Sequence, residues 1–300
     1  MGQQDWLAAR FEEHRPHLRQ VAYRMLGSRA EADDAVQDAW LRLSRAGAEG
    51  VDNLGGWLTT VVARLCLNVL RSRNVRGETS LSAHVPDPVV SPEGDLPPEE
   101  EAVLADTVGL ALLVVLDTLT PAERLAFVLH DMFSLPFEDI AEVVGRSPAA
   151  ARQLASRARR RVRGAEVPIA DVDHRRQRQV VDAFLRATRR GDFDALIEVL
   201  DPDVVVRIDT GPRGPATMVL HGAPAVAGQV VKGLTSILGR PTVRSWPMKV
   251  NGTPGVVLTM DGRPAAVMGF VVVDGKIAEI DSLADPERVG LVAADMATDA

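Results

Sequence analysis

The stretch from Leu135 to Gly164, LPFEDIAEVVGRSPAAARQLASRARRRVRG, constrains the fold more than any other part of the chain. Its apolar spacing and its start and stop signals predict a helix, a tight turn at Gly145 and a second helix that begins after Ser147. The second helix carries many arginines, although the whole chain has a formal net charge of −7. A basic helix-turn-helix inside an acidic chain indicates a confined nucleic-acid-binding surface.

This second helix is predicted to have one apolar and one polar face. Apolar residues recur every three or four positions from Ala151 to Val162, which places them on an inward face. Arginine on the outward face can reach phosphates and base edges. The outward positions are Arg152, Gln153, Ser156, Arg157, Arg159 and Arg160.

Composition excludes several classes of protein. With 300 residues and 46% hydrophobic content, the chain is long and apolar enough for two or three compact domains. Its single cysteine, Cys66, cannot form an intramolecular disulfide, and no cysteine and histidine spacing indicates a zinc site, so we expect no metal and no cofactor. The first ten residues lack a signal-peptide pattern and no apolar run is long enough for a membrane span. A cytoplasmic protein is the expectation.

The chain is predicted to consist of two all-α modules followed by an α+β domain. The first module covers residues 1–85 and the second, which contains the helix-turn-helix, covers 102–165. Between them, residues 86–101 read PDPVVSPEGDLPPEEE, without a basic residue, and predict a flexible acidic linker. A short connection at 166–173 leads to the last domain, 174–300.

The last domain is expected to be a curved sheet wrapped over helices. An amphipathic helix is predicted for His174–Arg190, closed by Gly191, and a second helix follows from Phe193 to Leu200. From Asp203 onward the apolar period falls to two, with the runs VVVRI, TVRSWPMKV, VVLTM and AAVMGFVVV. Asp-Gly at 274–275 joins the last of these to KIAEIDSL as a hairpin signal.

Two more helices of the first module carry candidate surfaces. The helix Ser28–Leu43 sets carboxylates opposite an apolar stripe, which indicates either a partner surface or a solvated helix face. The helix Trp57–Arg73 places Thr60, Arg64, Asn68 and Arg71 on one face. Arginine beside an aromatic ring suits melted DNA, because bases stack on rings while phosphates attract guanidinium groups. Trp57 itself has an equally good alternative as a core residue.

The order of EADDAVQDAWLRL, WLTTVVARLCLNVLRSR, an acidic linker and the helix-turn-helix block resembles a bacterial extracytoplasmic-function sigma factor of the sigma-seventy class. The resemblance covers roughly residues 5 to 165. It implies binding to core RNA polymerase and to promoter DNA, both duplex and melted. The implied polymerase-binding residues are Asp33, Asp34, Gln37, Asp38 and Trp40. Those implied for the minus-ten element are Asn53, Trp57, Thr60, Arg64, Asn68 and Arg71. Those implied for the minus-thirty-five element are Arg146, Ser147, Ala149, Arg152, Gln153, Ser156, Arg157 and Arg160.

The last third of the chain resembles the cone-shaped SnoaL-like domain, which a subgroup of these sigma factors carries. A D-G-G-G-K loop and an N-P-D-K-L segment are typical of that subgroup, and this chain has DTGPR at 209–213 and DPERV at 285–289 in their places. The resemblance implies a domain that regulates the sigma modules in cis, in place of a separate anti-sigma protein. The implied regulatory residues are Asp209, Arg213, Asp285, Pro286, Glu287 and Arg288.

Two other functions compete with this interpretation. The SnoaL-like fold often catalyses, and His221, Trp246 and Asp281 are candidates to line a pocket that holds a small ligand. His221 also has a plainer role as a turn residue and Asp281 as a surface residue, so we predict a protein that is not an enzyme. The second alternative is a ligand-sensing helix-turn-helix regulator that binds DNA without core polymerase.

Overall fold

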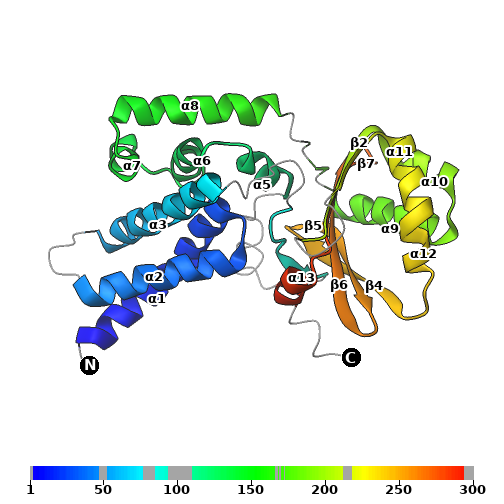
Figure 1. The fold of residues 1–300 in the computed structure, drawn as a ribbon, viewed down its shortest axis with the longest axis horizontal. Coiled ribbons are helices and arrows are strands. Elements are labelled where there is room, and N and C mark those ends of the chain that lie inside the picture. Colours follow the sequence, from blue (N-terminus) through cyan, green and yellow to red (C-terminus); the bar gives the residue numbers. More distant parts are fainter. Residues whose placement is uncertain are drawn as a thin grey trace. The chain divides into compact units, whose positions relative to one another are not determined.

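The computed structural model describes residues 3–46, 53–76, 85–93, 110–165, 168, 170–171, 173–211 and 218–293 (Figure 1). The chain forms two compact units. The first combines residues 1–80 with 115–166, and the second combines 81–114 with 167–300. Helix α5 (Leu110–Asp117) spans the second of these boundaries in the sequence. Among the described helices, none has both the length and the apolar character that crossing a bilayer requires.

The described part of the first unit is helical. Its long helices α1, α2 and α3 belong to the predicted first module, and shorter helices with the helix-turn-helix make up the second. The elements are α1 (Gln3–Leu26), α2 (Arg29–Ala46), α3 (Leu54–Arg76), α6 (Pro121–Phe127), the π-helical turn η1 (Val128–Met132), α7 (Phe137–Val144) and α8 (Pro148–Gly164).

The two helical modules pack against each other within this unit. Arg124 of α6 is buried and donates from Nε and Nη2 to the carbonyl oxygen of Arg24 in α1, both at 3.1 Å. The same guanidinium pairs with Asp117. Arg64 of α3 donates to the carbonyl oxygen of Glu142 in α7 at 3.4 Å. The two modules therefore form one compact body here, while the predicted domain boundaries remain predictions.

Local capping signals explain most of the helix boundaries. The Thr120 hydroxyl caps α6 by accepting from the N–H of Glu123, and the Glu123 carboxylate accepts from the N–H of Thr120. At the helix-turn-helix, Gly145 adopts a φ of +68° as α7 ends, and the Ser147 hydroxyl accepts from the N–H of Ala150 at 3.3 Å. Both boundaries follow from residue chemistry, because glycine tolerates the left-handed conformation and serine satisfies a free N–H.

The second unit is the predicted α+β domain. Its helices are α9 (His174–Arg190), α10 (Phe193–Val199), α11 (Ala223–Gln229), the π-helical turn η2 (Val230–Leu234), α12 (Thr235–Leu238) and α13 (Pro286–Val292). Its strands are β1 (Val90–Pro92), β2 (Leu200–Asp209), β3 (Met218–His221), β4 (Val243–Val250), β5 (Thr253–Met260), β6 (Arg263–Val273) and β7 (Lys276–Leu283).

The seven strands form one mixed sheet in the order β1-β4-β5-β6-β7-β2-β3. Only the β2–β7 pair is parallel; the other described pairs are antiparallel. Three two-residue turns join β4 to β7 at Asn251-Gly252, Asp261-Gly262 and Asp274-Gly275, and each has a positive φ at both residues. That is the turn geometry that asparagine or aspartate followed by glycine favours.

The two faces of this sheet differ in chemistry. One face packs against α9 to α12, and its core includes Phe184 of α9 with its ring 5.6 Å from that of Phe270 (Figure 1). Because side chains alternate along a strand, the next residues point to the other face. That opposite face carries charged residues on β2 and β7, with Arg207 opposite Asp281 in the register. The arrangement is the cone-shaped α+β fold expected from the SnoaL-like resemblance.

The expectation of a flexible linker is wrong for residues 86–93. Val90–Pro92 forms strand β1, which pairs antiparallel with β4 at the edge of the sheet. Residues 85–88 are all buried. The backbone N–H of Val89 donates to the Asn251 side chain at 2.8 Å, and the N–H of Asn251 donates to the carbonyl of Val89 at 2.8 Å. Prolines and valines give this part of the acidic stretch an apolar surface to bury, so it joins the C-terminal domain. Residues 94–101 lie outside the described residues.

Candidate functional site

Helix α8 presents the predicted duplex-DNA residues to solvent. Its inward stripe is buried as expected, with Ala151, Ala155 and Ala158 all 0% exposed. Arg152 is exposed and pairs with Glu138 of α7 at 3.0 Å, while Arg159 is half-buried against Asp131. The predicted residues that the structure leaves exposed are Arg146, Ser147, Ala149, Arg152, Gln153, Ser156, Arg157 and Arg160.

Three of these arginines are distinctive. In the described part of the chain, the guanidinium groups of Arg146, Arg157 and Arg160 have no hydrogen-bond or ion-pair partner. Arg146 lies in the turn before α8, and Arg157 and Arg160 lie in the second half of the helix. An exposed guanidinium without an internal acceptor keeps all of its donors for an external anion such as phosphate.

Helix α3 holds the residues predicted for melted DNA. Arg64, Asn68 and Arg71 are exposed along one side of it, and Trp57 and Thr60 are half-buried. Asn53 precedes the helix and accepts from the N–H of Gly56 at 2.9 Å, so it acts as the N-cap. The core stripe on the other side is buried, with Leu58 and Val62 at 0% exposure. The structure brings these six residues onto one helix and its start.

Helix α2 carries the predicted acidic surface. Asp33, Asp34, Gln37 and Asp38 are exposed. Trp40 is half-buried, because its ring packs 5.2 Å from Phe11 of α1. Asp33 is already paired with Arg19 of α1 at 2.6 Å. The helix begins as its serine predicts, since the N–H of Glu31 reaches the Ser28 hydroxyl at 3.5 Å. The Glu31 carboxylate pairs instead with Arg73 of α3, which ties the two helices together.

In the second unit, the two predicted regulatory loops meet each other. Asp285 caps α13 by accepting from the N–H groups of Glu287 and Arg288, at 2.9 and 3.3 Å. Gly211 of the first loop has a φ of +71°, and a Cβ there would lie 2.0 Å from Oδ2 of Asp285. The N–H of Ala284 donates to the carbonyl of Asp209 at 2.7 Å. Glycine is thus required at 211 by backbone conformation and by space. Arg213 lies outside the described residues.

These loops hold residues 85–93, which we call the linker segment. Arg288 donates from Nη1 to Asp209 at 2.8 Å, from Nε to Asp87 at 2.7 Å and from Nη2 to the carbonyl of Val85 at 2.5 Å. The second Asp209 contact comes from the linker itself, since the N–H of Val85 donates to its Oδ2 at 3.0 Å. We call Asp209, Gly211, Asp285 and Arg288 the clamp. Val85 is 0% exposed and Asp87 is 5% exposed, so the groups of the linker segment that the clamp binds are buried.

Comparisons with known proteins agree with this arrangement. Residues 10–76 match the family model for Sigma-70 region 2, and residues 109–162 match that for Sigma-70 region 4. The chain is 36% identical over 299 residues to the probable ECF RNA polymerase sigma factor SigI of Mycobacterium tuberculosis, covering 99% of both chains. The chain belongs to the extracytoplasmic-function family of RNA polymerase sigma factors.

A second relative covers the C-terminal domain as well. The ECF RNA polymerase sigma factor SigJ of Mycobacterium tuberculosis is 37% identical over 287 residues, which span 93% of this chain and 91% of that protein. The crystal structure of SigJ superposes with a TM-score of 0.73 over 94% of this sigma factor and 97% of its own chain. The likeness therefore includes the helical modules and the α+β extension.

Sequence reasoning found the clamp of this sigma factor but missed what it holds. Asp209, Asp285 and Arg288 are among the predicted regulatory residues, whereas the prediction assigns Asp87 to a flexible linker and Val85 to the end of the first module. The apolar run VPDPVV at 85–90, inside an otherwise acidic stretch, is the signal that could have identified it. A segment that is meant to stay solvated rarely carries consecutive valines.

The second unit of this sigma factor contains a cavity between the sheet and helices α11 and α12, and the predicted pocket residues do not line it. His221 is exposed at the end of edge strand β3, and Trp246 is 42% exposed on β4. Asp281 is buried but points to the opposite face of the sheet, where it contacts Arg207 at 3.1 Å. Strand alternation explains why the prediction for Asp281 is wrong. Its neighbours on β7, Ile280 and Ser282, face the cavity, and Asp281 faces the other side of the sheet. Cys66 is buried in the helical core, and burial raises the pKa of its thiol to about 12.

Proposed function

We propose that this chain binds bacterial core RNA polymerase and directs it to promoter DNA, and that its C-terminal domain restrains this activity through the clamp. Membership in the sigma family supports the first part. The hydrogen bonds from Arg288 to the linker segment carry the second. Both parts place the protein in the cytoplasm, where the polymerase acts.

The exposed helical surfaces suit the first part of this proposal. The carboxylates of α2 offer a compact acidic patch for the polymerase, and α3 offers arginine and amide groups for melted DNA. On α8, arginines with no internal partner are placed to bind the phosphates of duplex DNA, while Arg152 and Gln153 are placed to read base edges. The polymerase-independent regulator is not favoured, because both sigma-type regions are present in one chain.

The restraint follows from where the linker segment lies in the chain. It connects α3, which is assigned to melted DNA, to the helices that carry the helix-turn-helix. A linker held on the C-terminal domain has fewer residues free to span the distance between two promoter elements. The bond from Arg64 to the α7 backbone further keeps the two DNA-binding modules together. In this proposal, the two DNA-binding modules can separate on the promoter only after the clamp releases the linker segment.

We also propose that the C-terminal domain has no catalytic role. The side chains that line its cavity include no carboxylate, imidazole or thiol among the described residues. A general acid or base must lie within hydrogen-bond reach of its substrate. Turnover of a small carbonyl compound by the purified protein would contradict this proposal.

Run-off transcription with purified core polymerase tests the restraint. The variant Arg288→Ala should give more transcript than the parent chain, and Arg186→Ala should give the same amount, because Arg186 is an exposed residue of α9 outside the clamp. Failure of the parent to associate with core polymerase would overturn the sigma assignment. Equal transcription from parent and Arg288→Ala would overturn the restraint alone.

A further inference from the structure

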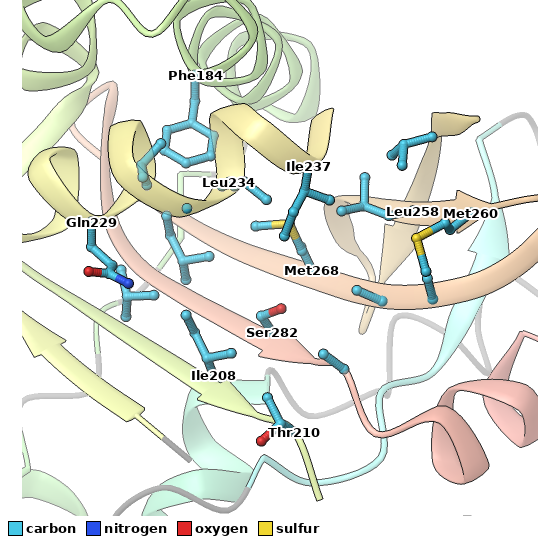
Figure 2. A pocket seen from close by; sticks show the side chains of 18 of the residues that line it. Phe184, Ile208, Thr210, Gln229, Leu234, Ile237, Leu258, Met260, Met268 and Ser282 are labelled. Atoms are coloured by element: carbon cyan, nitrogen blue, oxygen red, sulfur yellow. The ribbon is translucent and has the colours of Figure 1, made fainter. Parts of the chain in front are cut away.

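The C-terminal domain contains a cavity of about 500 Å³ between the helix-covered face of the sheet and helices α11 and α12. Phe184, Leu234, Leu258 and Met268 contribute apolar surface to it (Figure 2). This volume lies within the range of sites that enclose small organic molecules. Well-packed protein cores contain few voids larger than a water molecule, so a space of this size is unusual.

The lining specifies the chemistry of an occupant. Among the described residues that line the cavity, Arg240 alone carries a charge, and its side chain is exposed. Ser282 is 8% exposed and lies along the cavity (Figure 2), and its hydroxyl makes no hydrogen bond to the described part of the protein. The Thr259 hydroxyl, by contrast, accepts from Nε1 of Trp246 at 3.1 Å. Ser282 therefore offers an unused hydroxyl in a largely apolar chamber, whose lining also includes the exposed amide of Gln229.

We propose that this cavity binds an uncharged, largely apolar small molecule with a hydroxyl or carbonyl group that meets Ser282. A charged group in the interior would lose its hydration without a counter-ion, which is costly. The buried carboxylates Asp209 and Asp281 point to the opposite face of the sheet, so the molecule is bound and not transformed. This inference does not rest on the proposed restraint of transcription.

The cavity shares two strand ends with the clamp. Thr210 and Ala284 line one end of the cavity, and each is the chain neighbour of a clamp residue, Asp209 and Asp285 respectively. The Ala284 N–H bonds directly to the carbonyl of Asp209. A molecule that binds only the ordered arrangement of these strand ends stabilises that arrangement. Occupation of the cavity should therefore tighten the hold on the linker segment.

Binding is tested on the full chain with N-phenyl-1-naphthylamine, an uncharged apolar fluorophore. Its fluorescence should rise saturably, and 1-dodecanol should displace it at lower concentration than dodecane or dodecanoate. A lack of saturable binding overturns the site, and stronger displacement by dodecanoate overturns the uncharged ligand class.

Two variants locate this binding. Ala266→Phe fills the cavity and should abolish binding, whereas Ala225→Phe places the same ring on the exposed side of α11 and should leave it unchanged. Ser282→Ala is a small change that keeps the fold. It should weaken the binding of 1-dodecanol by about threefold to tenfold and leave the binding of dodecane unchanged. Equal loss for both compounds would contradict the role of Ser282, and unchanged binding by Ala266→Phe would place the ligand elsewhere.

Hydrogen exchange without polymerase tests the connection to the clamp. Saturating 1-dodecanol should slow exchange of the Val85 and Val89 N–H groups. If binding occurs and these rates stay the same, the connection is wrong while the site stands. Because transcription is not measured, failure here is separate from failure of the proposed restraint.

Discussion

Two arginine-bearing regions of this sigma factor use the same side chain in opposite ways. On α8, Arg157 and Arg160 are exposed, and within the described residues nothing pairs with their guanidinium groups. At the clamp, Arg288 donates to Asp87, Asp209 and the Val85 carbonyl. The difference shows that the acceptors supplied by the chain, and not arginine itself, decide whether a guanidinium group is used within the protein or stays available to solvent.

The energetics of the two regions differ accordingly. Water solvates the exposed arginines of α8, so replacing one of them should cost the folded protein little stability. The clamp is partly buried: Asp209 is 3% exposed, and Asp87 of the linker segment, which Arg288 also binds, is 5% exposed. Removing the cation from such a site leaves buried charges uncompensated, which costs far more than the pair contributes. Substitutions in the clamp should therefore have the larger effects.

The largest effect is expected from Arg288→Ala. The change should weaken the hold on the linker segment by about 3 kcal/mol, at the low end for a broken buried ion pair because Arg288 is partly exposed. Exchange of the Val85 N–H should then accelerate by roughly 100-fold. Arg186→Ala, on exposed α9, is the matched control. An unchanged rate at Val85 would show that the clamp does not depend on this arginine.

A smaller effect in the same region is expected from Gly211→Ala. The φ of +71° alone should cost about 1 kcal/mol, and the contact of the new Cβ with Asp285 should add about as much again. Gly262→Ala isolates the first contribution, because Gly262 has a φ of +76° and nothing within 4 Å of the added Cβ. Chemical denaturation monitored on the C-terminal domain would measure both. Equal losses would mean that Asp285 moves aside freely.

On α8, Arg157→Ala and Arg160→Ala should reduce promoter binding by the polymerase complex without changing stability. If each arginine touches one phosphate, each change should make the log–log salt slope shallower by about 0.9. The loss should be similar on all promoter sequences, whereas changing Gln153 should alter sequence preference. Binding titrations at several salt concentrations would measure the slopes. A sequence-dependent loss from Arg157→Ala would assign that residue to a base edge.

The helical surfaces were more predictable from sequence than the clamp. The face of α8 depends on local spacing, on Gly145 and on Ser147, and all of these act within a few residues. The clamp joins Val85 to Asp209 and Arg288 across more than a hundred positions, and no local rule connects them. Its loops were found only because their composition resembles a family pattern.

Alternation along strands explains another part that sequence could not settle. In β7, Ile280 and Ser282 face the cavity while Asp281 faces the charged side, and a one-residue change of register would exchange them. The sequence predicted the strand but not which face would be covered by helices. Similarly, the linker segment became part of the sheet because β4 offered a free edge, which only the folded domain reveals.

The smallest effect should come from the buried charges beside the clamp, where Arg207 contacts both Glu279 and Asp281. Burial raises the pKa of Asp281, although Arg207 opposes this shift. A carboxyl with a raised pKa in the folded state favours its protonated form there. Its contribution to stability is therefore complete below its ordinary pKa and is lost as the pH rises through the raised value.

Between pH 4 and 7, protection of the β2 and β7 amides should fall with rising pH in the parent, and less steeply in Asp281→Asn. Asp261→Asn, in an exposed turn, should keep the slope of the parent. Identical slopes in all three proteins would mean that Arg207 compensates the burial of Asp281 completely. The buried cluster would then add no pH dependence to the stability of the sheet, and the contrast between the two regions would rest on the clamp alone.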